Sequence, residues 1–110
     1  MWVIKMLKIN LEYRKGILFV RLKGNLNKNT APKFMEYTLP IIEDYGIKYM
    51  VYNLEGLSSI DSVGENALLS GGKSVKENDG RVLIINNKIN TCLRFDTITD
   101  ELVALDLLKI

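Results

Sequence analysis

Residues 47–65 read IKYMVYNLEGLSSIDSVGE, and this stretch decides the fold. The run from Ile47 to Leu54 is mostly apolar, which is typical of a central strand covered on both faces. Residues 55–60 are expected to form a loop. Small and apolar residues then recur at helical spacing, at Ala67, Leu68, Gly71 and Val75. The stretch therefore predicts a buried strand that leads through a loop into a helix.

The chain before this stretch has the pattern of a hairpin followed by a helix. Apolar and polar side chains alternate over residues 7–13, the period-two pattern of a half-buried strand. Arg14-Lys15-Gly16 provides a short turn, and residues 17–22 form a second apolar strand. Thr30-Ala31-Pro32 predicts the start of a helix whose cap is the threonine hydroxyl, and Gly46 is well placed to end that helix.

The chain after residue 65 continues the alternation of helices and strands. Gly80 can stop the second helix, and residues 82–85 form another buried strand. A short final helix is expected from Thr99-Asp100-Glu101, whereas residues 89–98 fit a helix, a strand or one turn of each. Strands that alternate with helices imply crossover connections and parallel strand pairs. We therefore expect one α/β domain over residues 1–110, with a mixed central sheet of four to five strands flanked by three to four helices.

Composition excludes several classes of function. The 110 residues carry a formal net charge of +2, which gives no electrostatic footprint for nucleic acid. Histidine is absent, and with it the commonest general base and the commonest zinc ligand. The single cysteine, Cys92, cannot form an internal disulfide and is expected to be a small core residue. No stretch approaches the ~20 apolar residues of a membrane helix, and no signal-peptide pattern is present. We therefore expect a cytoplasmic protein that does not insert into membranes, binds no metal or cofactor and is not an enzyme.

The strand-to-helix junction carries the chemistry. Ser62 and Glu65 have the spacing of a capping box, and Asp61 is an equally good candidate for the cap. Either choice puts the Ser62 hydroxyl near the positive end of the helix dipole, where an anion is accommodated. A phosphate on Ser62 would add about −1.5 to −2 charges and repel a partner that is acidic there or docks by apolar contact. The alternative is that Ser62 only caps the helix.

Several motifs, in this order, resemble the STAS family and, within it, the bacterial anti-sigma-factor antagonists. Residues 17–27 resemble the second strand of the family and its Gly-x-Leu-Asp turn, with Asn27 in place of the aspartate. Residues 49–57 resemble its central strand. Residues 60–64 resemble its Met-Asp-Ser-Ser/Thr-Gly motif, in which the first serine is phosphorylated; here Val63 replaces the second hydroxyl residue. The resemblance is strongest over residues 7–86.

The resemblance implies a protein switch. The partner would be an anti-sigma factor with serine kinase activity that binds the unphosphorylated protein and can phosphorylate Ser62, and a protein phosphatase would reset the switch. The residues expected to form this candidate switch surface are Asn27, Ser59, Asp61, Ser62, Val63, Gly64 and Glu65. Two other classes of function stay open. The first is a STAS scaffold or accessory subunit of a larger complex, including a membrane transport complex, in which Ser62 is not modified. The second is an enzyme or a small-ligand carrier. The absence of histidine argues against catalysis.

Overall fold

The computed structural model describes residues 7–86 and 89–108, which form a mixed five-stranded sheet with the strand order β1-β2-β3-β4-β5. The strands are β1 (Leu7–Arg14), β2 (Ile17–Leu26), β3 (Tyr49–Ile60), β4 (Arg81–Ile85) and β5 (Asp96–Thr97), and the helices are α1 (Ala31–Asp44), α2 (Ser62–Glu77) and α3 (Glu101–Leu107). β1 is antiparallel to β2, and every other neighbouring pair is parallel. The expected α/β class is confirmed.

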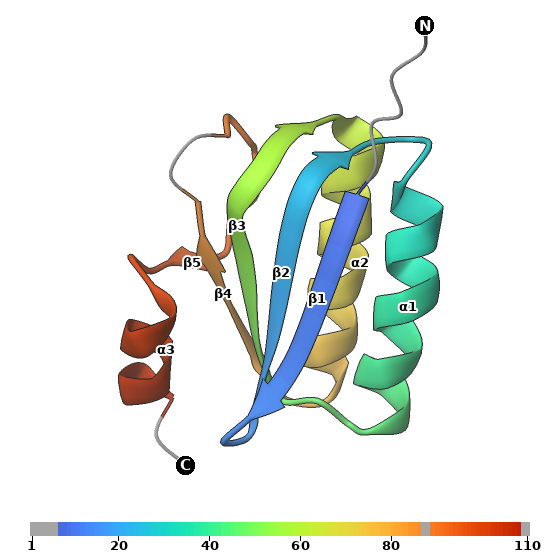
Figure 1. Cartoon of the computed structure of the whole chain (residues 1–110). Helices are drawn as coiled ribbons and strands as arrows, with labels where there is room; N and C mark the ends of the chain where they lie inside the picture. Colours follow the sequence, from blue (N-terminus) through green and yellow to red (C-terminus); the bar gives the residue numbers. More distant parts are fainter. Residues whose placement is uncertain (1–6, 87–88, 109–110) are drawn as a thin grey trace, which may run out of the picture.

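The helices cover the two faces of the sheet unequally. α1 and α2 lie side by side on one face, and the short α3 lies on the other (Figure 1). Alternate residues of β2 therefore enter different cores, because successive side chains of a strand point to opposite faces. Leu18 and Val20 join the core beneath α1 and α2, while Ile17 and Phe19 join the core beneath α3. This double coverage explains the continuous apolar runs in the central strands.

The N-terminal hairpin has the predicted short turn. Lys15 and Gly16 both have positive φ, 52° and 81°, and Arg14 pairs with Ile17. Two positive φ values are the mark of the type I′ turn, whose twist matches that of the flanking strands. The turn fixes the register of the whole hairpin, from Leu7 opposite Gly24 onward.

Residues 55–60 are not a loop as the sequence predicts. β3 continues to Ile60 and stays paired with β2 as far as Leu26, with register shifts at Arg21/Lys23 and Gly24/Asn25. These irregularities bend the two strands together, and polar side chains are tolerated because this part of the sheet is open to solvent. The extension carries the start of α2 beside the end of β2.

The predicted side-chain cap of α1 is also wrong. Thr30 is the N-cap residue, but its hydroxyl donates to the carbonyl of Asn25 at 2.8 Å and accepts from the N–H of Asn27 at 2.9 Å. The hydroxyl thus closes the turn between β2 and α1 instead of binding the first turn of the helix. α1 continues through Pro40, and Gly46 follows its end with φ of 58°.

Residues 89–98, for which the sequence allows a helix, a strand or one turn of each, have little regular structure. They are irregular up to Phe95, and β5 follows, two residues long and parallel to β4. Cys92 is exposed, so its expected place in the core is wrong. Within residues 7–86 and 89–108, no helix is long and apolar enough to cross a membrane, and no group of side chains is suited to hold a metal ion.

Candidate functional site

Asp61 forms the junction between β3 and α2. Its Oδ1 accepts from the N–H of Gly64 at 2.8 Å, and its Oδ2 accepts from the N–H of Lys28 at 3.0 Å. Its own N–H donates to the carbonyl of Leu26 at 3.2 Å. Asp61 is therefore the N-cap of α2, which settles the alternative left open by the sequence, and it joins α2 to the β2–α1 turn.

The cap is a fixed negative charge. The hydrogen bond from Gly64 is the main cause that lowers the pKa of Asp61, and the N–H groups of Lys28 and Val63 add to it, as does the Lys28 ammonium. Hydrogen bonds to a carboxylate favour its ionised form. Any charge added to the neighbouring Ser62 would therefore lie next to an existing anion.

Ser62 is the first residue of α2 and is exposed. Asn66 and Leu69 follow at helical spacing on the same face, because residues four and seven apart line up along a helix. Both are exposed, and Leu69 keeps 47% of its surface open to solvent. Val63 lies beside Ser62 and keeps 44%. The start of α2 thus presents a hydroxyl beside the uncharged Val63, Asn66 and Leu69 and next to the Asp61 carboxylate. Two added negative charges would make this surface strongly negative.

Gly64 lets the first turn of α2 lie against β2. A Cβ at this position would overlap the carbonyl oxygen of Leu26 and lie 3.0 Å from Cγ1 of Ile60. The carbonyl belongs to the backbone of a paired strand, so it cannot move aside cheaply. The glycine of the motif therefore sets how closely the helix with Ser62 approaches the sheet.

Asn27 and Ser59 lie at the same end of the molecule but are held by other partners. Asn27 Oδ1 accepts from the N–H of Asn29 at 2.9 Å, which orders the turn before α1. The Ser59 hydroxyl donates to Asn25 Oδ1 at 2.5 Å, across the β2–β3 pair. Both residues shape the backbone next to Asp61.

Glu65 does not close a capping box. Its Oε2 accepts from the Thr91 hydroxyl at 2.5 Å and from the N–H of Cys92 at 2.8 Å. These two hydrogen bonds, with that from Thr91 the larger cause, lower the pKa of Glu65. The carboxylate thus fastens the segment before β5 to the first turn of α2. No local sequence pattern predicts this contact, since Thr91 lies 26 positions after Glu65.

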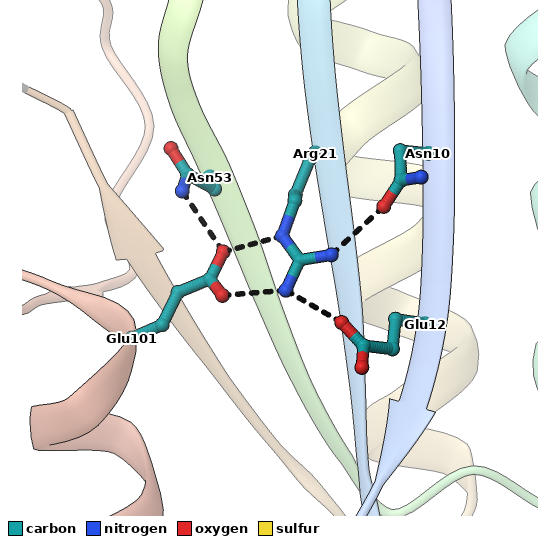
Figure 2. Close-up of polar contacts among 5 residues, drawn as sticks. All are labelled: Asn10, Glu12, Arg21, Asn53 and Glu101. Carbon is teal, nitrogen blue, oxygen red and sulfur yellow. Dashed lines mark hydrogen bonds and ion pairs between the residues drawn. The ribbon is translucent and has the colours of Figure 1, made fainter.

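A second polar cluster, which sequence reasoning missed, joins α3 to the sheet (Figure 2). The Arg21 guanidinium donates two hydrogen bonds to the Glu101 carboxylate, at 2.8 and 2.7 Å. It also contacts Asn10 and Glu12 on β1, both at 2.8 Å, and Asn53 on β3 donates to Glu101 at 2.9 Å. The bond with Glu101 is the main cause that raises the pKa of Arg21, and the same bond lowers the pKa of Glu101. The cluster positions α3 on its face of the sheet.

The fold and the junction define a small α/β protein in which an exposed serine opens a helix next to a capping aspartate. The profile of the STAS domain family matches residues 8–96, and the chain belongs to this family. It is 27% identical over 78 residues to an anti-sigma F factor antagonist of Paenibacillus polymyxa, covering 71% of this chain and 67% of that protein.

Three solved structures have closely similar folds. The Bacillus anti-sigma factor antagonist SpoIIAA, in its unphosphorylated form, superposes with a TM-score of 0.78 at 19% identity, covering 93% of this chain and 98% of that one. SpoIIAA has also been solved in a phosphorylated form, with a TM-score of 0.71 to this chain. A Thermotoga maritima protein described as a candidate anti-sigma factor antagonist superposes with a TM-score of 0.79 at 15% identity, over 93% of this chain and 95% of that one. At these identities the three structures establish the fold alone.

Proposed function

We propose that this chain is an anti-sigma-factor antagonist. In its unphosphorylated state it binds an anti-sigma factor that is also a serine kinase, and phosphorylation of Ser62 ends that interaction. A protein phosphatase restores the binding form. The whole chain acts as one STAS domain in the cytoplasm, as a binding protein without catalysis of its own.

The observation that carries the proposal is the exposed Ser62 at the N-terminus of α2, directly after the Asp61 cap. A phosphate at this place is stabilised by the helix dipole and by the N–H groups of the first turn, so the fold tolerates it. Although the fold tolerates the phosphate, the binding of a partner would be weakened by it. The phosphate and Asp61 together place about three negative charges on the surface that carries Val63 and Leu69. An apolar or acidic contact surface on the partner would lose its complementarity.

The test uses the full chain as bait. Wild type, Ser62→Ala and Ser62→Asp are immobilised, incubated with an extract of the source cells with and without ATP, and the captured proteins are identified by mass spectrometry. We expect wild type and Ser62→Ala to capture an anti-sigma factor kinase. ATP should release it from wild type only, with a gain of one phosphate in the intact mass. Ser62→Asp should bind it about tenfold more weakly or worse.

Ser58→Ala is the matched control, because Ser58 is an exposed serine on the same segment but lies before the helix. It should be phosphorylated and released like wild type. An anti-sigma factor that binds Ser62→Asp as tightly as wild type would contradict the switch. Capture of a stable complex that never contains a kinase, with no phosphate under any condition, would favour the scaffold or accessory-subunit alternative.

A further inference from the structure

β1 is an edge strand with an unused side. It pairs with β2 on one side, and within residues 7–86 and 89–108 no segment pairs with its outer side. Arg14 and Ile17 flank a two-residue turn, and such flanking residues exchange hydrogen bonds. The even-numbered residues of β1 therefore bond to β2, and the N–H and C=O groups of Leu7, Ile9, Leu11 and Tyr13 point outward. An exposed strand edge of this kind is a template for another strand.

The seam between β1 and α1 is apolar and open. One hollow of about 410 Å³ is lined by Leu7, Ile9, Leu11, Lys33, Tyr37 and Ile41. A second hollow, of about 400 Å³, continues it past Tyr13, Ile41 and Tyr45. Tyr13, Tyr37 and Tyr45 keep 64%, 53% and 78% of their surface exposed. Large side chains gathered along a strand edge are typical of a surface that another protein covers.

The charges on the other face of β1 indicate which strand would pair with its outer edge. Lys8, Asn10, Glu12 and Arg14 point away from the seam. If two β1 strands pair antiparallel about a twofold axis at Asn10, Lys8 of each copy lies opposite Glu12 of the other. The same register places Ile9 opposite Leu11 and Leu7 opposite Tyr13, with all four outward backbone groups paired. Shifting the register of this β1–β1 pair by two residues puts Lys8 opposite Arg14 in one direction and opposite Asn10 in the other. Both shifted registers lose the charge complementarity.

We propose that β1 pairs with β1 of a second copy of this chain in this register, which joins two five-stranded sheets into one. The α1 helices of both copies then lie on the same face, and the seam with its tyrosines is covered at the twofold axis. Glu12 is available for the contact because 44% of its side chain is exposed even though it binds Arg21 of its own chain. The interface uses the outer edge of β1, whereas the first turn of α2 lies against Leu26 of β2 and Ile60 of β3, and the inference does not depend on the proposed function.

Charge reversal tests the register. The full chain is sedimented at a series of concentrations in a buffer of low ionic strength, and wild type should form a particle of twice its 12.5 kDa mass. Lys8→Glu replaces two attractive pairs with two repulsive ones and should weaken dimerisation about tenfold. Within one copy Lys8 lies opposite Lys23, so the substitution relieves a repulsion and the fold is kept. The double variant Lys8→Glu/Glu12→Lys restores opposite charges and should restore the dimer.

Lys23→Glu is the matched control, since Lys23 lies on the same face one strand further from the edge; it should leave the dimer intact. A wild-type chain that sediments as a monomer at every concentration would overturn the proposal. So would a dimer that Lys8→Glu leaves unchanged, because its interface would lie elsewhere. A monomer whose β1 edge instead takes a strand from another protein would overturn it as well.

Discussion

Gly71 lies in the middle of α2, where glycine ordinarily costs about 1 kcal/mol relative to alanine. Here a Cβ would overlap the Tyr52 hydroxyl, which is fully buried and donates to the carbonyl of Leu68 at 2.9 Å. The Tyr52 ring is held between Phe34 and Phe95, so it cannot turn away. We expect Gly71→Ala to lower the free energy of unfolding, measured by urea titration, by about 1–2 kcal/mol. The same substitution inside a helix usually raises it.

Tyr52→Phe supplies the control for this prediction. Alone it removes one buried hydrogen bond and should cost about 1 kcal/mol. Combined with Gly71→Ala it also removes the oxygen that the new methyl group would meet, so the double variant should be more stable than the sum of the two single changes predicts. Additive losses, or a gain in stability from Gly71→Ala alone, would show that the helix does not rest on this hydroxyl.

A second prediction for a single residue concerns Asp61 and the dependence of stability on pH in the acid range. Its pKa is lowered from 3.8 in the folded chain, so the ionised cap stabilises the fold above that value and the contribution is lost as the pH falls below it. Asn is an equally good N-cap but does not titrate. The difference in unfolding free energy between wild type and Asp61→Asn should therefore be largest near neutral pH and shrink below pH 3.8. A difference that is constant from pH 7 to pH 3 would contradict the charged cap.

At the scale of elements, α3 is held by apolar packing and by a polar cluster. Ala104 is buried, Val103 and Leu105 pack against the same core, and Arg21 binds Glu101 through two hydrogen bonds. We expect Glu101→Ala to lower the free energy of unfolding by about 1–2 kcal/mol, a value reduced for partial exposure. Hydrogen exchange of the α3 amides should accelerate more than that of α1 or α2.

The Arg81–Asp96 pair offers the control. It spans 3.2 Å, and its side chains are 48% and 70% exposed, so solvent screens it. Arg81→Ala should change the stability by less than about 0.5 kcal/mol. If Arg81→Ala and Glu101→Ala had equal effects, the cluster in Figure 2 would be no more than a surface contact.

The same elements show what the sequence could predict. The hairpin, both long helices and the apolar strands were predictable, because their periodicity and turn residues are local signals. The extension of β3 over residues 55–60 was not, since its polar side chains carry no strand pattern and its pairing with β2 is a tertiary interaction. The Ser62 junction was predictable for the same local reason. The contacts of Glu65 with Thr91 and of Arg21 with Glu101 join residues 26 and 80 positions apart, and no local pattern encodes them.

At the scale of the whole molecule, phosphorylation is a large electrostatic change. The chain carries a net charge of +2, and one phosphate of about −2 would bring it near zero. The same charge would lie at a helix N-terminus, where it would not disturb packing. The charge of the surface would therefore change while the fold stays constant, which is the property the proposed binding switch requires.

The two proposed surfaces lie on different parts of the sheet and should act independently. β1 forms one edge of the sheet, whereas Ser62 lies where the central strand β3 leads into α2. Ser62→Asp should therefore leave the sedimenting mass of the dimer unchanged, and Lys8→Glu should leave the affinity of one chain for an anti-sigma factor in solution unchanged. On a densely coated surface the wild-type dimer can engage two partner molecules, so its apparent affinity should exceed that of Lys8→Glu by about 100-fold or more. If Lys8→Glu weakened binding equally in solution and on the surface, β1 would belong to the partner-binding site.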